Sequence, residues 1–126
     1  MRYVLDTSAV LAVRPPSLEG EVAVSTATLA ELHFGVLVAK DAIARAERLR
    51  RLSVVQSMFA ALPVDDAVAQ AYGRLAAAVA AAGRQPRARV LDLLIAATAA
   101  AHQAHLVTAN AQDLVGLDGL VDIVEL

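Results

Sequence analysis

The chain has no cysteine among its 126 residues, which excludes disulfide bonds, a thiolate nucleophile and a zinc site built on thiolates. Any metal ion would therefore bind oxygen or imidazole ligands, and hard divalent cations are the expected ones. Lysine occurs once, as Lys40, and the GxxxxGK[ST] motif is absent. These two absences disfavour the nucleotide enzymes that place a lysine on a phosphate.

Long hydrophobic runs are also lacking. The longest apolar candidate, from Leu93 to Leu106, is interrupted by Thr98, His102, Gln103 and His105 and is shorter than the span of about 18 residues that crosses a bilayer. The acidic Asp6 falls within the first residues, where a signal peptide would carry its apolar region. We therefore expect a soluble protein without a membrane segment, located in the cytoplasm.

Neither sign of charge dominates the sequence. Lys and Arg number 11, Asp and Glu number 13, and the net charge of −2 gives no indication of general, charge-driven binding to nucleic acid. Apolar residues make up 58% of the chain, with a mean hydropathy of +0.56, which excludes a disordered chain and suffices for a core. This length and composition predict a single domain over residues 1–126.

Short β-branched runs alternate with segments of helical periodicity along the chain. Ser25 or Thr26, and the pair Asp65 and Asp66, are typical helix N-caps, whereas Gly83 is a typical helix end. Strands are predicted over 3–5, 22–25, 62–64, 105–108 and 121–124, and helices over 9–13 before Pro15 and Pro16, 26–40, 41–62, 66–82 and 91–104. This alternation predicts a three-layer α/β fold with a mostly parallel sheet of four to five strands.

Two acidic residues follow predicted strands. Asp6 comes directly after the first strand, and Asp113 follows the fourth strand through a turn at Asn110. Because parallel strands end at one edge of the sheet, where ligands bind in such folds, both carboxylates are expected at that edge. Each also has a structural interpretation, since Asp6 can cap a helix and Asp113 can cap a short helical turn.

Two further acidic residues lie in apolar helices. Glu31 belongs to a predicted helix that is apolar nearly all round, and the neighbours of Asp92 one and two turns along its helix are Ile95, Ala96 and Ala99. Asp92 could alternatively complement the helix dipole. A cluster of four carboxylates would repel and have raised pKa values, and divalent cations would remove that cost.

Four segments carry a resemblance that covers almost the whole chain. They read VLDTSAVL at 4–11, STATLAELHFG at 25–35, DLLIAATA at 92–99 and LVTANAQDL at 106–114. In this order and at these separations, the sequence resembles PIN-domain proteins, and among them the VapC ribonuclease toxins of bacterial toxin–antitoxin pairs.

The resemblance implies an endoribonuclease that depends on Mg²⁺ or Mn²⁺. It implies Asp6 and Asp92 as the central metal ligands, with Glu31 and Asp113 completing the acidic site. Supporting polar residues would be Thr7, Ser8 and Asn110, and either Asn110 or Asp113 could lie nearer the metal. One ion or two could take part. The implied partners are RNA, a VapB-like antitoxin and a second copy of the chain.

The chain departs from many of these relatives just before Asp92, where they carry a further acid and this sequence has Arg87-Ala88-Arg89. We expect Arg84, Arg87 and Arg89 to contact RNA phosphates, although a solvated basic loop would have the same composition. With only four aromatic residues in the chain, RNA shape would contribute more to specificity than base stacking.

Two other functions fit parts of the pattern. A degenerate PIN-like domain could serve only as a protein-interaction module. A phosphatase of another α/β family could also begin with a strand and an aspartate, but its chemistry needs a second aspartate where this chain has Ser8.

Overall fold

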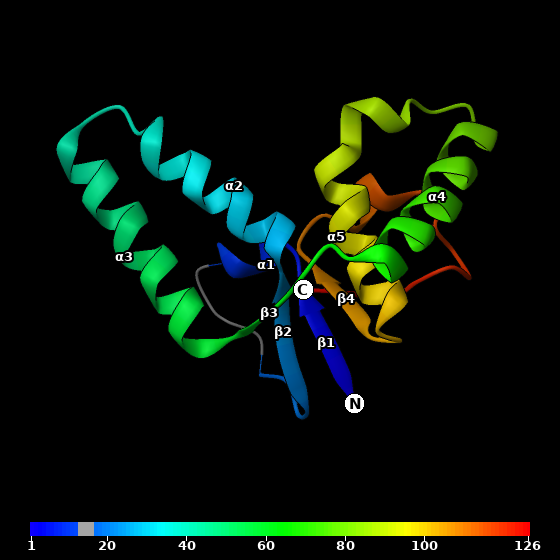
Figure 1. Ribbon diagram of the computed structural model, residues 1–126, viewed down its shortest axis with the longest axis horizontal. Helices are drawn as coiled ribbons and strands as arrows, with labels where there is room; N and C mark the ends of the chain where they lie inside the picture. The colour runs from blue at the N-terminus through cyan, green and yellow to red at the C-terminus, as the bar shows by residue number, and fades with distance from the viewer. Residues whose placement is uncertain (13–16) are drawn as a thin grey trace.

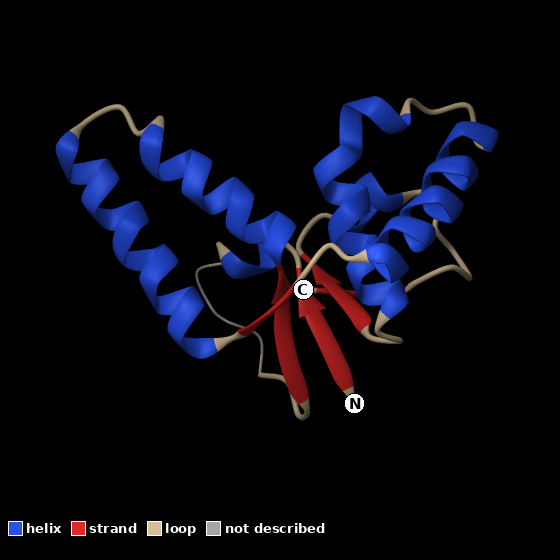
Figure 2. Ribbon diagram, viewed as in Figure 1, coloured by secondary structure: helices blue, strands red, loops and turns tan. Residues whose placement is uncertain are grey.

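The computed structural model describes residues 1–12 and 17–126, and its strands form a parallel sheet of five in the order β3-β2-β1-β4-β5 (Figures 1 and 2). The register pairs Val4 of β1 with Ala23 of β2 and with Leu106 of β4. The strands are β1 (Arg2–Leu5), β2 (Glu21–Ser25), β3 (Ala60–Leu62), β4 (His105–Thr108) and β5 (Asp122–Glu125). The predicted three-layer α/β fold is confirmed, and the sheet is parallel throughout.

Helices connect consecutive strands, as parallel pairing requires. The α-helices are α1 (Thr7–Val10), α2 (Thr26–Leu37), α3 (Ala42–Met58), α4 (Asp66–Ala81) and α5 (Val90–Ala101), and the 3₁₀ turns are η1 (Pro86–Arg89) and η2 (Ala111–Leu114). Figure 1 shows α2 and α3 running side by side on one flank, with α4 and α5 on the other. Within residues 1–12 and 17–126, no helix is both long and apolar enough to cross a bilayer.

The core lies on both faces of the sheet because successive strand residues point to opposite sides. On β1, Val4 packs with α4 and α5, whereas Leu5 packs with Val24, Val55 and their neighbours on the other face. The central strands β1 and β4 are therefore covered on both faces. This packing fixes the positions of their carboxyl ends in the middle of the sheet.

Several predicted boundaries needed correction. The strand predicted over 62–64 lies at Ala60–Leu62, because Pro63 has no N–H to donate to a strand ladder, and α3 correspondingly ends at Met58 rather than at residue 62. Helix α2 ends at Leu37 rather than at residue 40. Helix α5 covers Val90–Ala101 instead of 91–104, and Gln103 after it has a φ of 53°, which a continuing helix does not allow.

The remaining differences are small. The last strand is shifted by one residue to Asp122–Glu125, and part of the predicted basic loop forms the turn η1. Helix α1 begins at Thr7 and ends at Val10, whereas the predicted end at Val13 and the stop at Pro15 and Pro16 lie outside the described residues. Ser25 and Asp65 cap α2 and α4 as predicted, through bonds to the N–H groups of Ala27 and Val68.

The order of the strands determines where a ligand can bind. From β1 the chain proceeds outward through β2 and β3, then crosses back to β4 on the other side of β1. Connections thus leave β1 and β4 in opposite directions, which opens a crevice beyond their carboxyl ends. Asp6 follows β1 at this point, and the loop containing Asn110 follows β4.

Candidate active site at the carboxyl ends of β1 and β4

Asp6 is fixed by the start of α1. Its Oδ1 accepts a hydrogen bond of 2.9 Å from the N–H of Ala9 and one of 2.6 Å from the Ser8 hydroxyl. Asp6 is therefore the N-cap of α1, and its side chain also lines a cavity at the sheet edge. The structural and the functional interpretations of this residue are compatible, because the cap uses Oδ1, whereas Oδ2 accepts no hydrogen bond from the described residues.

Ser8 ties the ends of the two central strands together. Its hydroxyl oxygen accepts a hydrogen bond of 2.9 Å from the N–H of Ala109 and lies 3.3 Å from the hydroxyl oxygen of Thr108. The Thr108 hydroxyl in turn accepts a bond of 3.1 Å from the N–H of Asn110. The loop after β4 is thus attached to the loop after β1 through hydroxyl groups.

Three of the four acids singled out in the sequence share one small cavity of about 60 Å³. Asp6 comes from the end of β1, Asp92 from α5 and Asp113 from η2, so three separate parts of the chain contribute carboxylates. The predicted supporting residues Thr7, Ser8 and Asn110 line the cavity as well. Thr108 lines it too. Sequence reasoning missed Thr108, although a hydroxyl at the last position of a strand and two residues before Asn110 is a recognisable turn signal.

Asp92 lies in the first turn of α5, where no side chain caps the helix. Its helix neighbours Ile95, Ala96 and Ala99 are buried as predicted, which anchors the helix against the sheet. The pKa of Asp92 is raised, first by its partial removal from water, and further by the Asp6 and Asp113 carboxylates. The Arg89 guanidinium acts in the opposite direction.

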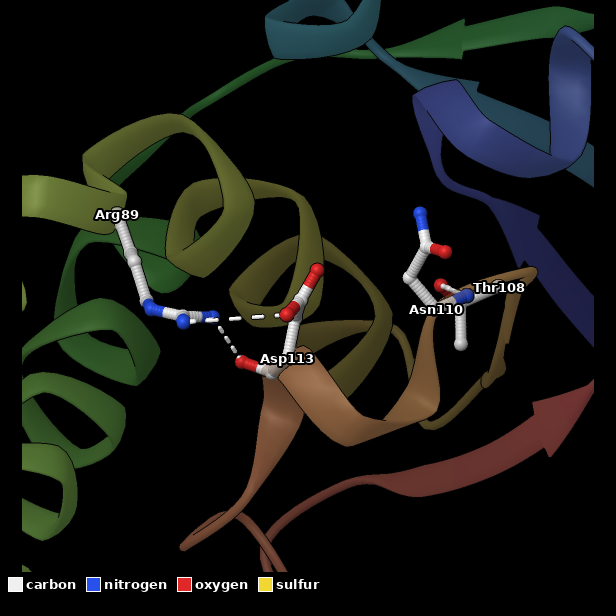
Figure 3. A network of polar contacts seen from close by, with 4 residues as sticks. All are labelled: Arg89, Thr108, Asn110 and Asp113. Carbon is white, nitrogen blue, oxygen red and sulfur yellow. Dashed lines mark hydrogen bonds and ion pairs between the residues drawn. The ribbon is translucent and has the colours of Figure 1, made fainter.

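Arg89 is a cationic side chain that contacts this acidic group. It pairs with Asp113 over 3.9 Å between Nη2 and Oδ1, and its Nη1 donates to the Asp113 carbonyl oxygen (Figure 3). None of the three arginines lines the acidic cavity itself, and Arg84 and Arg87 are exposed, without an ion pair among the described residues. Of the three arginines expected to contact RNA, only Arg89 is therefore held beside the carboxylates, where it neutralises part of their charge.

Glu31 does not line the cavity of the other three acids. Its Oε1 accepts a hydrogen bond of 2.6 Å from the Thr7 hydroxyl, and its side chain faces a separate cavity on the α3 side. Thr7 lines both cavities. The expected cluster of four carboxylates is thus arranged as three in one cavity and one in the next, with Thr7 between them.

Comparison with known proteins places this geometry in a family. The PIN domain matches residues 3–115 of the chain. The chain belongs to the PIN-domain family. It is 39% identical to Ribonuclease VapC5 of Mycobacterium tuberculosis, across 95% of this chain and 90% of that protein, and 36% identical to Ribonuclease VapC4 of the same organism, across 85% of each.

A solved structure extends the likeness to the whole fold. The PIN-domain chain superimposes with a TM-score of 0.86 on a crystal structure of VapBC-5 from Mycobacterium tuberculosis, a member of the VapBC family of toxin–antitoxin systems. The two share 40% sequence identity over 99% of this chain and 98% of that one. The four segments that suggested a PIN-domain protein are thus embedded in the fold of that family.

The acidic cavity of this PIN domain suits a hard divalent cation. Its donors are carboxylate, hydroxyl and amide oxygens, and three carboxylates approach each other with one arginine to balance them. In the part of the chain that the structure describes, no three acidic or histidine side chains lie close enough together to enclose an ion. Mg²⁺ needs no such enclosure, because it commonly binds through one or two carboxylates, waters and substrate phosphates.

The raised pKa of Asp92 predicts how the stability of the metal-free PIN domain depends on pH. An unfolded chain ionises this residue near 3.8, whereas the folded chain does so at a higher pH. The folded state therefore holds this proton more tightly, and the contribution of Asp92 to stability falls as pH rises from 3.8 through the raised pKa. Urea denaturation in EDTA across this range checks the effect, with Asp92→Asn as the control. A constant stability difference between the two proteins at every pH would contradict it.

Proposed function

We propose that this PIN-domain chain is an endoribonuclease that depends on Mg²⁺ or Mn²⁺ and acts as the toxin of a toxin–antitoxin pair. The observation that carries the proposal is the convergence of Asp6, Asp92 and Asp113 in one cavity beyond β1 and β4. It is supported by the 39% identity to a protein named Ribonuclease VapC5 over nearly the whole chain.

Each residue has a role that its contacts support. Asp6 and Asp92 would hold the cation, with Asp113 beside them, and Ser8 orients Asp6 through its 2.6 Å hydrogen bond. When bound, the cation would orient the scissile phosphate, stabilise charge on its oxygens and lower the pKa of an attacking water. Arg89, already beside Asp113, adds a cationic group at the rim where an RNA phosphate would approach.

Removal of divalent cations tests this proposal. Purified protein incubated with total RNA in Mg²⁺ or Mn²⁺ is expected to generate discrete cut ends, and EDTA is expected to reduce the rate at least about 100-fold because the carboxylates alone cannot activate water. Excess Mg²⁺ added after EDTA should restore cleavage. Equal cleavage with and without EDTA would contradict metal dependence, and no cleavage in any metal would contradict the nuclease.

We also propose a VapB-like antitoxin and a second copy of the chain as partners. Large apolar side chains are exposed along α2 and α3, and such surfaces commonly mark interfaces: Phe34, Leu37, Val38, Ile43 and Leu49. Solved structures with this fold include VapBC-5 of Mycobacterium tuberculosis and VapBC2 of Rickettsia felis. A strictly monomeric species in light scattering, without affinity for a small protein encoded beside it, would contradict both partners. The cytoplasmic location stays a prediction from the sequence.

A further inference from the structure

A second cavity lies beside the acidic one and is not explained by metal binding. It measures about 320 Å³ and opens between α1, α2 and α3. Leu11, Leu32 and Gly35 give it an apolar lining, Glu31 contributes a carboxylate, and Arg48 and Arg51 contribute two guanidinium groups. Its volume is at the lower end of the range of roughly 300–1,000 Å³ for ligand pockets, which suits a ligand the size of one nucleotide.

The position of this cavity relates it to the cleavage site. Thr7 lines both cavities, and its hydroxyl is bonded to Glu31 over 2.6 Å. One residue therefore separates the cavity from the carboxylates of Asp6 and Asp92. A chain lying across the acidic cavity would continue past Thr7 into the second one.

The charges in the cavity favour an anionic ligand. Among the described residues, neither Arg48 nor Arg51 forms an ion pair, although Glu31 lines the same cavity. Glu31 is instead engaged by Thr7. Arg48 is oriented by a hydrogen bond of 2.6 Å from its Nη1 to the carbonyl oxygen of Gly35, which leaves its other donors available. Two exposed guanidinium groups above an apolar lining match a phosphate attached to a base or ribose.

We propose that this cavity binds the nucleotide of an RNA strand that adjoins the cleaved bond, with its phosphate on Arg48 and Arg51. The inference rests on the proposed ribonuclease function and adds a substrate-positioning site to it. The apolar residues would contact the base or ribose, and Glu31 could accept a hydrogen bond from a hydroxyl. The RNA strand would then run from Arg89, past Asp6 and Asp92, to helix α3.

The chain offers matched control variants for this site. Arg50 lies on α3 next to Arg51 and does not line the cavity of Glu31; it lines a neighbouring groove with Val54 and Met58, which Arg51 also borders. Arg45 donates to the carbonyl oxygen of Leu37 over 3.3 Å, much as Arg48 donates to Gly35, but lies away from the cavity. Arg48→Gln and Arg51→Gln can therefore be compared with Arg45→Gln and Arg50→Gln, which remove the same charge from the same helix.

Binding of a fluorescein-labelled single-stranded RNA, measured in EDTA over a series of salt concentrations, tests the proposal without cleavage. We expect Arg48→Gln and Arg51→Gln each to weaken binding roughly five- to tenfold and to reduce the salt slope by about 0.7, the value for one lost phosphate contact on a single strand. The two control variants should keep the wild-type slope. All four arginines are exposed, so melting temperatures should stay close to wild type.

The outcomes separate this site from the ribonuclease function. Equal slopes in all four variants, or no RNA affinity in the wild-type protein, would overturn the nucleotide site. A loss of affinity for an antitoxin with unchanged RNA binding would overturn it in favour of a protein ligand. If Arg48→Gln and Arg51→Gln weaken RNA binding while wild-type protein fails to cleave RNA in Mg²⁺, the site stands and the proposed activity fails.

Discussion

Asp92→Asn is expected to abolish RNA cleavage, with a rate reduction of at least about 100-fold, while it slightly stabilises the metal-free protein. The substitution preserves the size of the side chain but removes a charge that lies in a cavity with two other carboxylates. Since partial removal from water and the Asp6 and Asp113 carboxylates raise the pKa of Asp92, its ionised form costs folding free energy at neutral pH. Because the side chain nevertheless keeps much of its contact with solvent, we expect a gain of roughly 0.5 kcal/mol or less.

The metal response of this variant provides the sharper measurement. Mg²⁺ is expected to raise the melting temperature of the wild-type protein, because a cation that binds only the folded state stabilises it, and to leave Asp92→Asn nearly unchanged. Asp118→Asn serves as the control, since this exposed acid lines neither cavity. An active Asp92→Asn variant, or one that still responds fully to Mg²⁺, would be incompatible with Asp92 as a ligand.

Two substitutions of Asp6 are expected to distinguish its role in catalysis from its role as a helix cap. Asparagine caps helices about as well as aspartate, so Asp6→Asn should preserve α1 and lose cleavage at least about 100-fold with the carboxylate charge. Asp6→Ala should lose the same activity and in addition about 1 kcal/mol of stability, because the N–H of Ala9 and the hydroxyl of Ser8 lose their acceptor. Urea denaturation and RNA cleavage on the same preparations measure both effects.

This pair of variants also decides between a nuclease and a non-catalytic interaction module. A module that only binds a partner would need Asp6 for its cap alone, and Asp6→Asn would then behave like the wild-type protein in every assay. Loss of cleavage in Asp6→Asn with an unchanged unfolding transition would exclude that alternative.

Much of the fold could be predicted from the sequence because its determinants are local or follow from chain order. Alternating strands and helices require a parallel sheet, and parallel strands end at one edge, so Asp6 and the loop with Asp113 had to be neighbours. The burial of Ile95, Ala96 and Ala99 followed from helical periodicity. The same periodicity placed Asp92 on the helix face that these residues share.

Other features depend on packing that no local pattern encodes. The rotation of α2 about its axis decides whether Glu31 faces the acidic cavity or the one beside it, and tertiary contacts of buried residues such as Ala27 and Val36 determine that rotation. The pairing of Arg89 with Asp113 spans 24 positions and joins η1 to η2. Arg48 and Arg51 were part of a charged surface helix in sequence terms, and only the position of α3 beside α1 makes them part of a cavity.

The hydrogen bonds of Ser8 have a consequence for protein synthesis. They join residues about a hundred positions apart, since the Ser8 hydroxyl meets Thr108 and the N–H of Ala109. Strand β1 leaves the ribosome first but acquires its β4 neighbour only after residue 108 has emerged. A nascent chain shorter than this has Asp6 without the opposite wall of its cavity. The proposed metal site is therefore assembled only after residues 108 and 109 have been translated, and we expect nascent chains that stop before them not to cleave RNA.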